Sequence, residues 1–163
     1  VERALLAEAL GEGGPPGAAE MVRDLVLLLR TPFYGGLPAV LLYELARLAL
    51  PLHLDVGEAL MWQGGVDDDV YVVVSGRLEV LVAAGSAEAA RSLGTLGAGE
   101  VVGEVAFLSG EPRSASLVAQ EPTECLVLRA TYMRLLGYAH PELLLRLGRL
   151  LARRLREANR RLV

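Results

Sequence analysis

The stretch that decides the fold is GEVAFLSGEPRSAS, which runs from Gly103 to Ser116. Gly103 allows a tight backbone turn, and the residues after it can begin a short helix whose first N–H groups point at an anion. Arg113 adds a guanidinium, which can donate two parallel hydrogen bonds to phosphate oxygens. Ionised Glu104 only accepts hydrogen bonds, so it suits a sugar hydroxyl and would repel phosphate. These opposite preferences predict a site that orients one ligand carrying both a phosphate and a sugar hydroxyl.

A cyclic nucleotide carries a phosphate and a ribose hydroxyl. The segment Gly103–Ser116 resembles the phosphate-binding cassette of the cyclic nucleotide-binding domain family. That family includes bacterial catabolite activators, regulatory subunits of protein kinase A and nucleotide-gated channels. The resemblance runs from about Phe33 to the C-terminus, through Asp55-Val56-Gly57-Glu58, Gln63-Gly64-Gly65 and the run from Val70 to Gly76. It implies a ligand-binding β-roll followed by a closing helix.

The resemblance also implies roles for individual residues. In the family, the residue that matches Glu104 receives the ribose 2′-hydroxyl, and the residue that matches Arg113 holds the cyclic phosphate. Ser114 matches a position that can add a phosphate contact. The expected ligand is cyclic AMP or cyclic GMP, with cyclic AMP favoured because the Arg-Ser-Ala run resembles the catabolite activators, and no cofactor is expected. The expected ligand-binding residues are Gly103, Glu104, Val105, Ala106, Arg113, Ser114, Ala115, Arg154 and Asn159.

The middle of the chain predicts a β-structure. Between Leu50 and Leu128, short aliphatic and β-branched runs alternate with glycine, aspartate and proline, a pattern typical of all-β cores. We therefore expect a mainly β protein with flanking helices, built as an eight-stranded double-sheet jelly roll. The predicted strands are Leu50–Leu54, Ala59–Trp62, Asp69–Val74, Arg77–Val82, Ala90–Leu96, Glu100–Val102, Ser114–Ala119 and Glu124–Leu128, with a turn at 83–88.

The N-terminal part predicts helices. Val1–Leu10 has a helical pattern, Gly11–Gly17 interrupts it as a Gly/Pro linker, and helical spacing resumes over Ala18–Arg30 and Leu37–Leu48. We expect residues 1–32 to form N-terminal helices with their linker. Residues 33–163 are expected to form the cyclic nucleotide-binding domain, with the β-roll at about 50–128 and the closing helix at about 141–162.

The closing helix begins at Pro141 and carries two apolar stripes. Leu143, Leu147 and Leu150 form the stripe expected to face the roll. The second stripe has the three- and four-residue spacing of a coiled-coil seam, which indicates a homodimer through this helix. The members of this seam are Leu144, Gly148, Leu151, Leu155, Ala158 and Leu162.

The same helix resembles that of the catabolite activators, which reaches over the base of the nucleotide. Ala158 falls where those proteins offer a hydroxyl to adenine, so the chain departs from them at this position. Asn159 falls on the adjacent position, which contacts the base from the other subunit. In some bacterial channel relatives, an arginine of this helix caps the purine. Arg153 or Arg154 could therefore contact the base instead of Asn159.

The composition of the chain limits which kinds of partner are expected. The chain has 163 residues, a net charge of −4, no lysine, and no apolar run of the length of a membrane-spanning helix. Direct binding to nucleic acid is not expected, although seven arginines against one acid make the region 146–161 basic. The single Cys125 cannot form an intrachain disulfide and is expected to be buried, which agrees with a cytoplasmic location.

The acidic triplet, the single tryptophan and the two histidines are interpreted as structural features and not as parts of a binding site. The triplet Asp67-Asp68-Asp69 is interpreted as a solvated turn, because its consecutive carboxylates do not follow a calcium-loop pattern. Trp62 is interpreted as a core residue, with base stacking as the alternative. His53 and His140 are the only histidines, and no metal site is expected.

Two functions remain open from these residues. The first is a regulatory sensor in which cyclic nucleotide binding moves the closing helix and signals to an effector that is missing from this chain or separate. The second is a scaffold that keeps the cassette's shape and acts in protein interaction or dimerisation. An enzyme is not expected, because the sequence shows no convincing nucleophile and base pair, metal cluster or paired carboxylates.

Overall fold

The computed structural model describes residues 17–83 and 89–162. The predicted helix Val1–Leu10, residues 11–16 of the predicted linker and residues 84–88 of the predicted turn lie outside the described residues. In chain order, the elements are α2 (Ala18–Arg30), α3 (Ala39–Leu48), β1 (Leu50–Leu54), β2 (Ala59–Met61), β3 (Val70–Ser75), β4 (Arg77–Ala83), β5 (Ala90–Gly97), β6 (Val101–Val102), α4 (Glu104–Ser109), β7 (Ser116–Ala119), β8 (Thr123–Leu128), α5 (Ala130–Ala139) and α6 (Pro141–Arg160).

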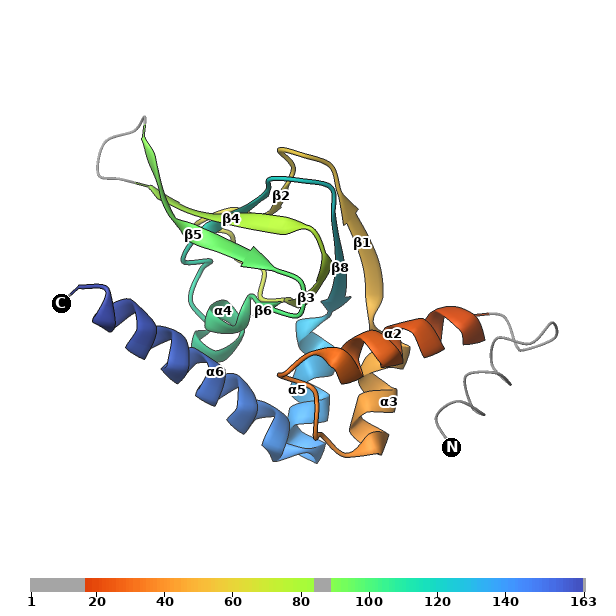
Figure 1. Cartoon of the computed structure of the whole chain (residues 1–163). Coiled ribbons are helices and arrows are strands. Elements are labelled where there is room, and N and C mark those ends of the chain that lie inside the picture. The colour runs from red at the N-terminus through yellow and green to blue at the C-terminus, as the bar shows by residue number, and fades with distance from the viewer. Residues whose placement is uncertain (1–16, 84–88, 163) are drawn as a thin grey trace.

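The eight strands form two four-stranded antiparallel sheets, which confirms the predicted double-sheet roll. The strand order is β1-β8-β3-β6 in the first sheet and β2-β7-β4-β5 in the second. The helices gather on one side of the roll, and α4 lies between the sheets and α6 (Figure 1). The cassette is therefore placed where the β-roll meets the long C-terminal helix.

The strand β3 of the first sheet is buried on both faces, which explains its continuous apolar run. Successive side chains of a strand point to opposite faces. Val70 and Val72 accordingly pack in one core cluster with the helices, whereas Tyr71 and Val73 pack in a second cluster inside the roll. Cys125 on β8 belongs to the second cluster, and burial raises the pKa of its thiol to about 12. The expected burial of this cysteine is confirmed.

Four helices share the first core cluster. Leu28 of α2, Leu45 of α3, Met133 of α5 and Leu147 of α6 are all almost fully buried there. Among the described residues, no helix is both long enough and apolar enough to cross a membrane. The burial of Leu143, Leu147 and Leu150 confirms that this stripe of α6 packs against the domain.

The structure corrects several sequence-based boundaries. α5 was not predicted, and the strand expected from Ser114 begins at Ser116. β2 ends at Met61, so Trp62 lies in the following turn with 66% of its surface exposed, and its interpretation as a core residue was wrong. α6 ends at Arg160 rather than Leu162.

Candidate functional site

The cassette folds as a tight turn followed by the short helix α4. Gly103 adopts a left-handed conformation with φ of 89°, which a residue with a side chain rarely adopts. The first turn of a helix has N–H groups without intrahelical acceptors, and in α4 this turn contains Val105 and Ala106, which line a cavity. Gly110 ends the helix in a second left-handed conformation.

Arg113 is buried beneath this turn, with only 3% of its surface exposed. Its Nη1 donates to the Gly103 carbonyl at 3.2 Å, and its Nη2 donates to the Asp69 carbonyl at 2.8 Å and to the Asp67 carboxylate. The guanidinium carbon lies 5.7 Å from the centroid of the Tyr71 ring, a cation–π distance. Burial raises the pKa of the Tyr71 phenol, which keeps the ring neutral.

One nitrogen of the Arg113 guanidinium makes no hydrogen bond with the described residues. The Nε–H of Arg113 is buried and has no hydrogen-bond partner among the described residues. An unpaired buried donor carries a free-energy penalty that an incoming acceptor removes. The guanidinium is thus held in place by protein carbonyls and one carboxylate, and its Nε–H stays unpaired within the part of the chain that the structure describes.

The acidic triplet Asp67-Asp68-Asp69 forms ion pairs and hydrogen bonds with other parts of the chain, which corrects its interpretation as a solvated turn. Asp67 pairs with Arg113, and Asp68 pairs with Arg134 of α5. An Asp69 carboxylate oxygen accepts the backbone N–H of Ala130 at 2.8 Å, at the start of α5. The three consecutive carboxylates are therefore divided between the cassette arginine and the helix that follows the roll.

Glu104 connects the cassette to α6. The residue is 3% exposed, and its Oε1 accepts a hydrogen bond from Arg154 Nη1 at 2.6 Å. Arg154 Nη2 also lies 3.7 Å from Glu100 Oε1. Oε2 of Glu104 accepts no hydrogen bond from a described residue, so one carboxylate oxygen anchors the helix while the other can accept a hydroxyl.

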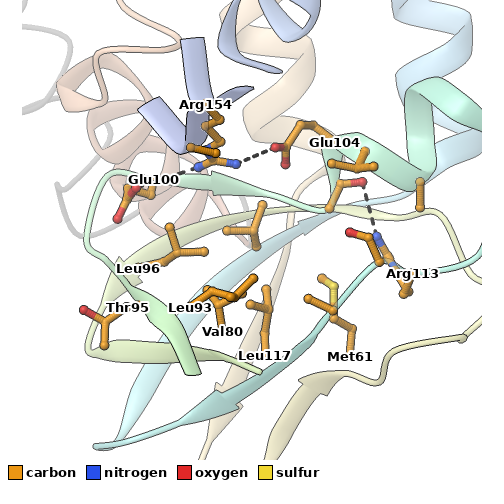
Figure 2. Close-up of a pocket in the computed structure, with 18 of the residues that line it drawn as sticks. Met61, Val80, Leu93, Thr95, Leu96, Glu100, Glu104, Arg113, Leu117 and Arg154 are labelled. Atoms are coloured by element: carbon orange, nitrogen blue, oxygen red, sulfur yellow. Dashed lines mark hydrogen bonds and ion pairs between the residues drawn. The ribbon is translucent and has the colours of Figure 1, made fainter. Parts of the chain in front are cut away.

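These groups line a cavity of about 380 Å³, which is within the usual size range of small-molecule sites. Figure 2 shows Arg113 at one end, Glu100 and Thr95 at the other, and Glu104 and Arg154 between them on the α6 side. The wall opposite α6 is apolar and consists of Met61, Val80, Leu93, Leu96 and Leu117. The cavity thus offers charged groups along one side and an apolar surface along the other.

The structure brings together most of the predicted site residues. The cavity is lined by Gly103, Glu104, Val105, Ala106, Arg113, Ser114, Ala115 and Arg154. Asn159 is exposed on α6 and does not line the cavity of its own chain, whereas Ala158 does. Of the two arginines offered as a cap, Arg154 lines the cavity and Arg153 is exposed elsewhere on the helix.

Sequence reasoning missed the apolar wall of the cavity and the residues that position Arg113 and Arg154. Asp67 and Tyr71 hold Arg113, and Glu100 supports Arg154. The only available signal was the position of Asp67 in the acidic triplet, since these contacts join residues far apart in the chain. Among the described residues, there is no group of three or more His, Cys, Asp or Glu side chains placed to hold a metal ion.

Comparison with known proteins agrees with this geometry. The sequence model of the cyclic nucleotide-binding domain matches residues 51–136. A cyclic nucleotide-gated potassium channel of Rhizobium etli is 31% identical over 124 residues, which is 76% of this chain and 33% of the channel. The cyclic AMP receptor protein of Thermus thermophilus is 41% identical over 105 residues, which is 63% of this chain and 47% of that protein.

A solved structure agrees as well. The crystal structure of the Thermus thermophilus catabolite activator protein aligns with a TM-score of 0.72 at 32% identity, covering 81% of this chain and 62% of that one. The chain spans between a third and a half of the two curated relatives described above. With the family match covering more than half of its residues, the chain belongs to the cyclic nucleotide-binding domain family.

Proposed function

We propose that the chain is a sensor module that binds a 3′,5′-cyclic nucleotide, preferentially cyclic AMP, and signals through movement of α6. The observation that carries this proposal is the buried Arg113, which lines the cavity, is fixed by Asp67 and by backbone carbonyls, and has an Nε–H without a partner among the described residues. A cyclic phosphate supplies the acceptor that this donor lacks, and charge-assisted hydrogen bonds of this kind are among the stronger ones.

The sugar is assigned to Glu104. A ribose 2′-hydroxyl can donate to Oε2 while Oε1 keeps its contact with Arg154 of α6. The ligand and the helix then share one carboxylate, so the bound nucleotide and the packed position of α6 favour each other. A ligand shifts a conformational equilibrium only by its differential affinity for the two states, and this shared carboxylate is a source of that difference.

The preference for cyclic AMP has two supports. The Arg113-Ser114-Ala115 run resembles that of the catabolite activators, and the Thermus relative is named a cyclic AMP receptor protein. The base is assigned to the apolar end of the cavity near Leu93 and Leu96, under Arg154. We place the module in the cytoplasm, where the free Cys125 thiol stays reduced. The effector is assigned to another segment or another protein.

Isothermal titration calorimetry with cyclic AMP and cyclic GMP, on protein unfolded and refolded to remove bound nucleotide, tests the proposal. We expect micromolar or tighter binding, stronger for cyclic AMP. Arg113→Gln should weaken it by about a hundredfold, corresponding to about 2–3 kcal/mol for a charged hydrogen bond. Arg134→Gln is the matched control, because Arg134 also pairs with the acidic triplet but does not line the cavity.

Circular dichroism and urea unfolding must accompany the titrations, since Arg113 also holds the loop that contains Asp67. The proposal requires that folded Arg113→Gln protein loses affinity while folded Arg134→Gln protein keeps it. Absence of heat with either nucleotide from folded wild-type protein would reject the sensor and favour a scaffold that acts in protein interaction.

A further inference from the structure

The outward face of α6 carries a row of four arginines that the ligand cavity does not use. Arg149, Arg153, Arg156 and Arg160 follow one another at intervals of four, three and four residues. At 3.6 residues per turn, these intervals keep all four within an arc of about 60° along about 16 Å of helix. We name this set the arginine row.

The arginine row is separate from the two apolar stripes of α6. Leu143, Leu147 and Leu150 are buried against the domain, and the predicted seam that contains Leu151 and Leu155 lies on another side. Helix geometry places the centre of the row about 120° around the helix from the centre of the buried stripe and about 150° from the centre of the seam. A partner on the row would therefore be different from the domain itself and from a second copy paired along the seam.

The row forms no ion pair within the part of the chain that the structure describes, although Glu157 lies four residues after Arg153 and three before Arg160. All four arginines are exposed, and none forms an ion pair with a described residue. The helix has two acids of its own. Glu142 lies near His140, and Glu157 lines the ligand cavity. Like charges three or four residues apart destabilise a helix, and the four arginines outnumber the one nearby acid, so a partner that neutralises the row would stabilise α6.

We propose that the arginine row docks an acidic α-helical segment of a partner protein. A helix with carboxylates at intervals of three and four residues presents them along one line with the same rise as the arginines. Guanidinium groups bind carboxylates through paired hydrogen bonds. The regular spacing of the row therefore fits a partner helix with the complementary pattern.

The charge of the rest of the chain favours a narrow partner. The helix α6 contains six arginines and two glutamates, a net charge of +4, whereas the whole chain has −4, so the remaining residues carry −8. A nucleic acid duplex or an anionic membrane would place negative charge next to this acidic remainder as well as next to the row. A single helix, about 10 Å wide, can cover the row alone.

Fluorescence anisotropy of the chain with labelled synthetic helical peptides tests the proposal. The probe peptide carries glutamates at intervals of four, three and four residues, and its isomer has the same composition with the glutamates distributed around the helix. We expect the probe to bind at least tenfold more tightly than the isomer. Arg153→Gln combined with Arg156→Gln should remove at least tenfold of that affinity. The matched control combines Arg77→Gln with Arg91→Gln on exposed strand positions, and it should change the affinity less than twofold.

A charge reversal gives a gain of binding that loss of folding cannot imitate. The chain with Arg153→Glu and Arg156→Glu should bind a lysine version of the probe and lose the glutamate version. Equal affinity for probe and isomer, or equal losses in the row and control variants, would overturn the proposal. So would tighter binding to phosphatidylglycerol vesicles or to duplex DNA than to the probe. Cyclic nucleotide affinity should stay unchanged in the row variants, so this test is independent of the ligand site.

Discussion

At the scale of single residues, the candidate site consists of charged side chains that are buried with only some of their hydrogen bonds made. Arg113 and Glu104 are each 3% exposed, and each keeps one polar atom free of protein hydrogen bonds within the described residues. Burial makes the unpaired Nε–H of Arg113 costly. A ligand that satisfies both atoms therefore gains more here than it would gain from the same groups on an exposed surface.

The ribose contact can be isolated by a double-mutant cycle. Glu104→Gln should weaken cyclic AMP binding about tenfold, since it removes the charge of the proposed hydroxyl acceptor. The same substitution should have little effect on 2′-deoxy-cyclic AMP, because that ligand has already lost the hydroxyl. Calorimetric titration of both proteins with both ligands gives the coupling. Equal losses with the two ligands would show that Glu104 does not receive the 2′-hydroxyl.

Asp24 on α2 predicts a pH dependence outside the site. Asp24 is 6% exposed, and its Oδ1 lacks a hydrogen-bond partner among the described residues. Burial raises the pKa of its carboxyl group. Arg23, whose Nε lies 3.5 Å from Oδ1, lowers this pKa and Glu20 raises it, but the effect of burial is the largest. The folded state then binds the proton more tightly than the unfolded state, so stability falls as the pH rises from the ordinary Asp pKa to the raised one. Asp24→Asn should remove this fall.

Urea unfolding between pH 3 and pH 7 measures this effect. Asp24→Asn and wild type should differ least at pH 3, where the wild-type carboxyl is protonated, and the variant should be relatively more stable at pH 7. Glu111→Gln is the control, because Glu111 is an exposed carboxyl. A parallel change in both variants would mean that the general loss of charge, and not the burial of Asp24, is responsible.

At the scale of elements, the two glycines that bound α4 have different roles. Gly103 and Gly110 both have positive φ, but a Cβ on Gly103 would lie 2.6 Å from the Asp69 carbonyl oxygen and 2.8 Å from Arg113 Nη1. A Cβ on Gly110 would meet nothing within 4 Å. Backbone strain is thus common to both positions, whereas steric conflict with the site belongs to Gly103.

Alanine substitutions separate these contributions. Gly110→Ala should cost about 1 kcal/mol of unfolding free energy, the strain of a left-handed residue, and should leave ligand affinity unchanged. Gly103→Ala should cost about 2–4 kcal/mol and weaken cyclic nucleotide binding at least tenfold, because Arg113 must move. Chemical denaturation and calorimetry measure the two effects. Similar affinities for both variants would contradict the close packing of the turn on Arg113.

The elements also show how far the sequence could predict this structure. All eight strands were predicted to within two residues at each end, because their apolar runs are bounded by glycine, proline and aspartate. The helix α5 was missed, although its start is held by the Asp69 carboxylate. The contacts of Asp67, Asp68 and Asp69 reach residues 44 to 66 positions away, and no local pattern encodes such contacts.

At the scale of the whole molecule, α6 is where the ligand site, the helical core and the protein surface meet. Arg154 contacts Glu104 of the cassette, whereas Arg146 of the same helix donates to the carbonyls of Phe33 and Gly35 at 2.7 Å each. One end of α6 is thus fixed to the segment between α2 and α3, and the other end depends on the cassette. If ligand binding moves α6, as proposed above, we expect the C-terminal half to move more than the N-terminal half.

That C-terminal half also carries the proposed dimer seam, which gives a prediction for the assembled state. Leu155 is 60% exposed, so it contributes little to the packing of its own domain. In a two-fold dimer, Leu155→Glu would introduce the carboxylate twice at one interface. It should weaken dimerisation by on the order of a hundredfold, about 3 kcal/mol, and leave the unfolding of the monomer nearly unchanged. Sedimentation velocity over a range of concentrations measures the shift.

Leu135→Glu is the matched control for this experiment, because Leu135 on α5 is 61% exposed and lies off the seam. If copies of the chain pair through α6, wild type and Leu135→Glu sediment as dimers at concentrations where Leu155→Glu is a monomer. If the two variants sediment alike, the seam is not an interface between copies.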